Sequence, residues 1–200
     1  GVDLTDADKI RNFLLMNEEQ EPQQYFFENY WEPIENRTNL QLDSFFRDYL
    51  MLKNRKYPNL KKVYETFTEY YRNNCLDKKE FFDELSDYSL AYQQVIESNT
   101  NNREINVILN RFNELAITVI RPFLMAIIRD YNNDLITSDE VIAIFETLES
   151  YVARRLITKT PSNSMQKVIS TLYSNLQKLQ NEPRNQNVPL VDLFNYLLLV

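Results

Sequence analysis

The stretch that decides the fold is residues 149–176, ESYVARRLITKTPSNSMQKVISTLYSNL, where an arginine pair closes one helical pattern and a polar turn opens the next. Thr160 and Pro161 mark the break between the two patterns. Apolar residues recur at helical spacing on both sides of it, at Val141, Ile144, Phe145, Leu148, Tyr151 and Val152 before the break and at Met165, Val168, Ile169, Leu172, Leu176 and Leu179 after it. We therefore predict two helices joined by a short turn, with the rest of the chain packed around them.

The same helical spacing runs through the rest of the sequence. The only glycine is Gly1, whereas strand hairpins and left-handed caps usually draw on glycine for positive φ. The pairs Thr5–Asp8, Asp77–Glu80 and Thr137–Glu140 are typical helix starts. We predict an all-α protein, an irregular bundle of about nine or ten helices without a sheet, whose turns use Asn, Asp, Ser and Pro.

Prolines and polar runs predict where the helices break. Pro22 should open a helix that Pro33 ends. Pro122 should kink or split a long apolar segment over residues 104–131, the expected central buried helix. We expect one helical domain over residues 1–180, followed by a loop and a final helix over residues 181–200 that either packs here or belongs to a truncated neighbour. The sequence lacks an initial Met, which favours an excised piece of a larger protein.

Composition excludes several kinds of chemistry. Without histidine and with Cys75 as the single cysteine, the chain lacks the residues for tetrahedral zinc sites, for Ser-His-Asp or Cys-His catalysis, and for an internal disulfide. Phosphate-cradling glycine loops are also missing. We expect no catalytic residue, metal or cofactor in this chain. Paired carboxylates such as Asp139 and Glu140 could bind Mg²⁺, but their pattern favours helix caps and solvated helix faces.

The single cysteine, Cys75, and the lack of a long apolar run indicate a protein of the cytoplasm. The formal net charge of −7 opposes the tight backbone binding of a protein that coats DNA. No apolar run approaches the roughly 20 residues that span a bilayer, so no membrane contact is expected. The 13 tyrosines and 12 phenylalanines could stack on bases, but their spacing on helix faces favours core packing.

One basic cluster stands out from this acidic background. It consists of Lys53, Arg55, Lys56, Lys61 and Lys62, which bracket a turn between two predicted helices. The functional interpretation is a candidate DNA-facing surface that contacts phosphates. The plainer alternative is a set of solvated helix ends.

Arg154 and Arg155 are the polar residues of this sequence that most suggest a specific contact. They follow Tyr151 by one helical turn and precede the apolar pair Leu156 and Ile157, so at least one guanidinium must leave a partly buried face. One interpretation is a phosphate or nucleotide contact through the planar fork of arginine. The other is an internal ion pair that fixes this helix to a neighbour, beside a helix start capped at residues 162–164.

Residues 149–167, ESYVARRLITKTPSNSMQK, resemble the helical region of GmrSD-type restriction proteins, the family with a DGQQR signature in its N-terminal domain. In that family a helix with a glutamate, an aromatic residue and an arginine pair runs into a Thr-Asn turn and a further helix. Residues 4–16, LTDADKIRNFLLM, look like the family's helix after the DGQQR domain. The segments YWEPIE, residues 30–35, and VYETF, residues 63–67, are similar to two further family patterns.

The resemblance implies a role in a larger protein. Members of the family combine a nucleotide-handling DGQQR domain, a helical region and often an HNH-type nuclease domain, and they restrict modified foreign DNA such as that of phages. The present chain has neither a DGQQR motif nor an HNH histidine. We expect a non-catalytic helical module that links and regulates those two domains. The implied partners are the other domains of the parent, DNA through the parent, and a second copy of the chain. The alternative is a helical protein-interaction scaffold without a nucleic-acid role. The candidate interdomain or phosphate contacts are Arg11, Asn12, Arg154, Arg155 and Asn163.

Overall fold

A computed structural model describes residues 4–16, 19–59, 61–74, 77–158 and 162–199, and all regular structure in these ranges is helical. The prediction of an all-α protein is therefore confirmed.

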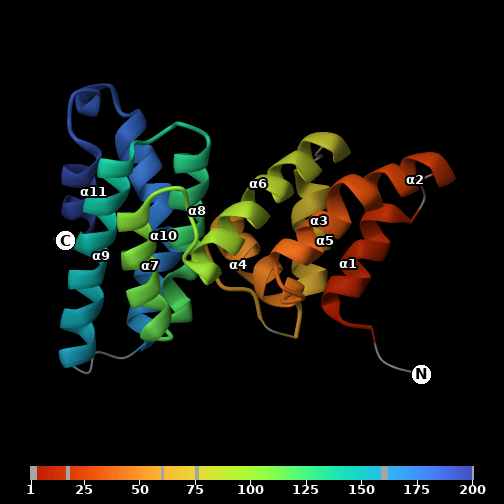
Figure 1. The fold of residues 1–200 in the computed structure, drawn as a ribbon, viewed down its shortest axis with the longest axis horizontal. Helices are drawn as coiled ribbons and strands as arrows, with labels where there is room; N and C mark the ends of the chain where they lie inside the picture. Colours follow the sequence, from red (N-terminus) through yellow and green to blue (C-terminus); the bar gives the residue numbers. More distant parts are fainter. Residues whose placement is uncertain (1–3, 17–18, 60, 75–76, 159–161, 200) are drawn as a thin grey trace. The chain divides into compact units, whose positions relative to one another are not determined.

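The chain divides into two compact units, residues 1–93 and residues 94–200. The first contains α1 (Asp6–Leu15), α2 (Gln20–Phe26), a π-helical turn η1 (Phe27–Trp31), α3 (Glu32–Arg37), α4 (Leu42–Asn54), α5 (Val63–Asn73) and most of α6 (Lys78–Glu97) (Figure 1). The second contains the end of α6, α7 (Arg103–Glu114), a 3₁₀ turn η2 (Thr118–Ile120), α8 (Arg121–Asn132), α9 (Ser138–Ile157), α10 (Ser162–Asn181), a 3₁₀ turn η3 (Pro183–Asn185) and α11 (Leu190–Leu199).

The first unit is built around an aromatic core. Helices α1, α4 and α5 pack against one another. Rings from α1, α2, η1, α4, α5 and α6 meet edge to face or stacked, for example Trp31 on Phe46 at 5.9 Å and Phe45 against Tyr92 at 5.5 Å between ring centroids. Such pairs contribute about 0.5–1.5 kcal/mol each beyond the area that they bury. The aromatic residues at helical spacing thus serve core packing here, as their spacing predicted. The fully buried rings of this unit are Trp31, Phe45, Phe46, Tyr49, Phe67, Phe82 and Tyr92.

Pro33 does not end the second helix, which corrects the expectation from sequence. The chain passes from α2 through η1 into α3 without a break, and Pro33 lies in the first turn of α3. Proline cannot donate a backbone hydrogen bond, and its ring collides with the carbonyl four residues earlier in a regular helix. The turn just before it is widened, with the Glu32 N–H bonded to the Phe27 carbonyl five residues back. This π-helical turn gives the ring room, so the helix continues to Arg37.

The second unit is built around α8. Pro122 splits the long apolar segment as expected, because α7 ends at Glu114 and α8 begins at Arg121. Every residue of α8 from Pro122 to Ile128 is buried, whereas α7 buries a single face. The central buried helix is therefore α8 alone. Helix α11 packs against α9 and α10, with Phe194 stacked on Phe123 of α8 at 5.3 Å.

The turns form without glycine, and some of their residues adopt a strained backbone conformation. Residues with positive φ in the described part of the chain include Asn39, Leu40, Arg55, Ser98, Ala116 and Asp134. Asn, Asp and Ser were the turn residues expected from sequence, but Leu40, Arg55 and Ala116 carry side chains that disfavour the left-handed region. Each of these three positions stores strain of roughly 1–2 kcal/mol that the surrounding packing offsets.

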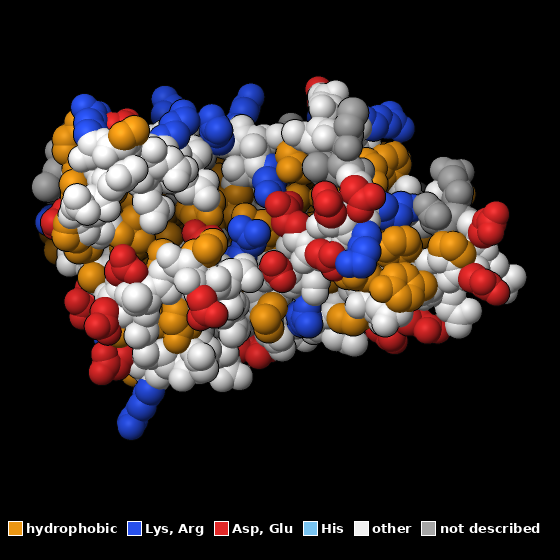
Figure 2. Space-filling model, turned by 90° about the horizontal axis from the view of Figure 1, so that it is seen from above, with side chains coloured by type: hydrophobic (Ala, Val, Ile, Leu, Met, Phe, Trp, Pro, Cys, Tyr) orange, Lys and Arg blue, Asp and Glu red, His pale blue; other side chains and the backbone are white. Residues whose placement is uncertain are grey.

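The surface mixes charges of both signs. On the face drawn in Figure 2, acidic and basic side chains are interspersed with exposed apolar ones. Among the described residues, no helix has the length and apolar character needed to cross a membrane.

Candidate functional site

The arginine pair lies at the joint between α9 and α10. Arg155 is half-buried, with its guanidinium carbon 4.8 Å from the centroid of the Tyr151 ring. Its Nη1 donates a hydrogen bond of 2.7 Å to the Ser164 hydroxyl near the start of α10. Arg155 therefore fixes one helix to the next across the turn. The contacts that hold Arg155 are a hydroxyl and an aromatic ring face. An ion pair was one of the two interpretations from sequence, and no carboxylate of the described chain pairs with Arg155, so that interpretation is wrong about the contacting group.

The neighbours of Arg155 are exposed. Arg154 lies on the solvent side, and the apolar residues Leu156 and Ile157 are 50% and 80% exposed. The side chain of Asn163 lies outside the described residues. The arginine pair thus has one member engaged within the fold and one free to meet a partner, next to an apolar helix end.

The candidate contacts on α1 are tied to their own helix. Arg11 lies 3.3 Å from the Asp8 carboxylate, one turn earlier, with about a third of each side chain exposed. Asp8 in turn completes a capping box with Thr5, and the Thr5 hydroxyl keeps the pKa of Asp8 below its ordinary value. Asn12 is half-buried, and its backbone carbonyl accepts the N–H of Met16. These contacts are local to α1, because Arg11 lies against its first turn and Asn12 closes its C-terminal end.

The basic cluster separates into two parts. Arg55, Lys56, Lys61 and Lys62 are exposed on the connection between α4 and α5, and none of them pairs with a described carboxylate. Lys53 instead points to Glu84 of α6, with an Nζ–Oε2 distance of 2.6 Å.

Lys53 belongs to a half-buried cluster that joins α4 to α6. Its ammonium lies 5.4 Å from the Tyr49 ring centroid and 5.2 Å from that of Tyr88. Tyr49 also donates its hydroxyl to Glu84, and burial together with this carboxylate raises the pKa of the Tyr49 phenol well above its ordinary value. These contacts explain why Lys53 is a structural cation despite its place in a basic run.

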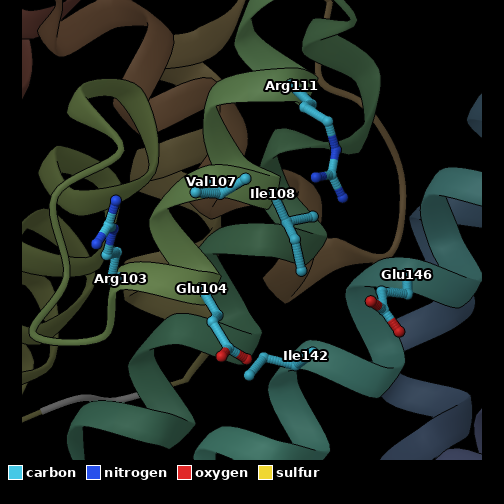
Figure 3. Close-up of a pocket in the computed structure, with 7 residues that line it drawn as sticks. All are labelled: Arg103, Glu104, Val107, Ile108, Arg111, Ile142 and Glu146. Atoms are coloured by element: carbon cyan, nitrogen blue, oxygen red, sulfur yellow. The ribbon is translucent and has the colours of Figure 1, made fainter.

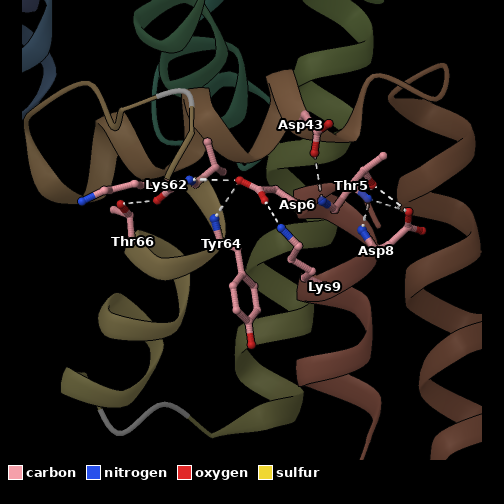
Figure 4. Close-up of polar contacts among 10 residues, drawn as sticks. Thr5, Asp6, Asp8, Lys9, Asp43, Lys62, Tyr64 and Thr66 are labelled. Atoms are coloured by element: carbon pink, nitrogen blue, oxygen red, sulfur yellow. Dashed lines mark hydrogen bonds and ion pairs between the residues drawn. The ribbon is translucent and has the colours of Figure 1, made fainter. Parts of the chain in front are cut away.

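The starts of α1 and α5 are linked through carboxylates from neighbouring helices (Figure 4). Asp6 accepts the backbone N–H groups of Val63 and Tyr64 at 3.1 and 3.2 Å, and its other oxygen lies 3.0 Å from Lys9 Nζ. Asp43, in the first turn of α4, accepts the N–H of Ala7 at 2.8 Å. The N-cap residue of α5, Lys62, makes no capping hydrogen bond with its side chain, and Asp6 takes that role.

A cavity of about 300 Å³ opens beside these helix starts. Two cations line it, Arg47 of α4 and Lys61 of the basic connection. Arg47 was missed by the sequence analysis, because it lies between core aromatics and outside any charge run. The remaining lining residues are Leu4, Thr5, Asp6, Asp43, Ser44 and Val63.

A second groove lies in the second unit between α7 and α9, with a volume of about 440 Å³ (Figure 3). Val107, Ile108 and Ile142 form its apolar floor. Arg103, Glu104, Arg111 and Glu146 provide charges around it, and Val107 is 49% exposed. Arg111 is held by a two-point contact with Glu149, at 2.6 and 2.8 Å.

Within the described ranges, no group of three or more acidic or cysteine side chains is placed to hold a metal ion. Comparison of the chain with protein-family models, with curated proteins and with solved structures gives no match.

Proposed function

We propose that this chain is a non-catalytic helical module of a modification-dependent, phage-defence restriction endonuclease. In this role it links a nucleotide-binding DGQQR domain to an HNH-type nuclease domain and transmits the state of one to the other. The chain lacks the histidine and the glycine loops that such chemistry uses, so catalysis would belong to the neighbouring domains.

The observation that carries this proposal is the contact of Arg155 with Tyr151 and Ser164. The stretch that most resembles the family contains this arginine, and its guanidinium is used to fix α9 to α10. A joint that one side chain holds between two 20-residue helices can change when a neighbouring domain moves, and clamping it would then block the relay. Arg154, Leu156 and Ile157 lie exposed at the same joint, where a neighbouring domain could contact them.

The reading frame of the parent protein provides the first test. A DGQQR segment upstream and an HNH segment downstream would support the proposal, and a frame that contains neither would contradict it. The second test uses the whole parent protein in a nucleotide-dependent DNA cleavage assay. Deleting this module, or clamping α9 to α10 by a cysteine pair, should uncouple cleavage from nucleotide. Unchanged nucleotide control in both variants would refute the relay.

The α7–α9 groove favours a second candidate, a protein-interaction scaffold without a nucleic-acid role. Its apolar floor is partly exposed through Val107, and charges of both signs surround it. Replacing Val107 by aspartate would separate the candidates. The scaffold predicts loss of a partner complex, whereas the restriction module predicts unchanged nucleotide control of cleavage.

A further inference from the structure

We propose that the cavity between α1, α4 and the start of α5 binds a phosphate group, with Arg47 and Lys61 as its cationic ligands. The volume of about 300 Å³ lies at the lower end of the range for small-molecule sites. Ser44 adds a hydroxyl to the lining. This site goes beyond the proposed function, since it requires neither a nuclease nor a nucleotide domain.

The two cations of the cavity are not neutralised within the fold. Neither Arg47 nor Lys61 has a described carboxylate within 4.0 Å. One face of the Arg47 guanidinium is covered by Tyr57, with its central carbon 5.5 Å from the ring centroid. The Nε of Arg47 is buried and has no hydrogen-bond partner. Because this Nε is closed to a ligand, a phosphate in the cavity would be bound by the terminal nitrogens of the guanidinium.

Both carboxylates of the cavity wall accept backbone N–H groups, and Asp6 also pairs with a lysine, so together they oppose an anion less than two free carboxylates would. Asp6 accepts two backbone N–H groups and pairs with Lys9. Asp43 accepts the N–H of Ala7 at the start of α1. Each therefore faces the positive end of a helix, where a negative side chain is favourable. Of the charged side chains that line the cavity, the two cations Arg47 and Lys61 thus face one carboxylate, Asp43, that has no cationic partner among the described residues.

The surroundings extend the positive surface beyond one phosphate. Arg55, Lys56 and Lys62 are exposed on the same connection as Lys61 and raise the local potential for an approaching anion. The phosphate group could therefore belong to a small phosphorylated compound or to the backbone of a nucleic acid. Both present the same chemistry to the paired cations.

The test titrates the 200-residue protein with two probes, inorganic phosphate followed by amide chemical shifts, and a fluorescein-labelled DNA duplex followed by anisotropy. The variants are Lys61→Gln and Arg47→Gln, and the control is Lys178→Gln, which removes an exposed lysine from α10 in the second unit. Thermal unfolding checks that each variant is folded. If Arg47→Gln proves unstable, the exposed Lys61→Gln decides the result alone.

Saturable binding of at least one probe is expected, and Lys61→Gln should weaken it by about tenfold, as the loss of one charged hydrogen bond implies. Lys178→Gln should keep the wild-type affinity. Binding of inorganic phosphate would indicate a small phosphorylated ligand. Binding of DNA alone, with a salt dependence shallower by roughly 0.9 in log–log slope in Lys61→Gln, would indicate a nucleic acid backbone. Absence of binding by both probes, or equal affinities in Lys61→Gln and Lys178→Gln, would overturn the proposal.

Discussion

Asp6 should be the most consequential single carboxylate for the stability of the first unit. Its side chain is only 17% exposed, and it accepts two N–H groups of α5 while pairing with Lys9. Removal of a capping side chain costs about 0.5–2 kcal/mol, and a partly exposed ion pair adds up to about 1 kcal/mol. Asp6→Ala should therefore lower the free energy of unfolding by roughly 0.5–3 kcal/mol.

The assay is urea denaturation followed by the fluorescence of Trp31, the single tryptophan, which is buried in the first unit. Glu65→Gln is the matched control, because it removes an exposed negative charge from the same first turn of α5 without removing a hydrogen bond. Its cost should not exceed about 1 kcal/mol. Asp6→Asn, which keeps one acceptor oxygen, should fall between the two. If Asp6→Ala costs no more than Glu65→Gln, the capping of α5 by Asp6 is refuted.

Two further predictions concern the second unit. Burial raises the pKa of Asp130, which bonds to the Tyr173 hydroxyl at 2.9 Å, so the folded state holds this proton more tightly than the unfolded state. The free energy of unfolding should therefore fall as pH rises from about 4 through the folded pKa of Asp130. Asp130→Asn lacks this titration, so denaturant titrations should show its stability rising relative to wild type between pH 4 and pH 7. A difference between the two proteins that does not change with pH would contradict this. Ala116 has φ of 52°, so Ala116→Gly should raise the free energy of unfolding by about 0.5–1 kcal/mol, whereas Ala153→Gly inside α9 should lower it by about 1 kcal/mol. Equal losses in both glycine variants would show that Ala116 is unstrained.

Local signals in the sequence predict local structure well in this protein. The capping boxes at Thr5 and Thr137 start α1 and α9 as expected, because the bonds involve residues three apart. The apolar spacing likewise predicts which faces are buried, since one helix period decides it. Pro33 shows where this reasoning fails. A π-helical turn can accommodate a proline, and no local rule at Phe27 announces that turn.

The candidate site depends on contacts between distant residues, which sequence patterns do not reveal. Asp6 caps a helix that begins 57 residues later. Lys53 appears in a basic run but pairs with Glu84, 31 residues away, while Arg47 appears in an aromatic stretch but lines a cavity with Lys61. Of the basic cluster, only Arg55, Lys56, Lys61 and Lys62 remain as exposed cations. Tertiary packing decides which charges are structural and which stay available to a ligand.

The structural role of Arg155 is tested most directly by thermal unfolding of Arg155→Ala beside Arg154→Ala, followed by far-ultraviolet circular dichroism. The contacts with Tyr151 and Ser164 are together worth about 1–2 kcal/mol at a half-buried position. For a chain of this size, Arg155→Ala should therefore lower Tm by about 2–8 °C. Arg154→Ala removes an exposed cation and should lower Tm by less than about 2 °C. An Arg155→Ala variant that keeps the wild-type Tm would contradict the assignment of Arg155 to the joint.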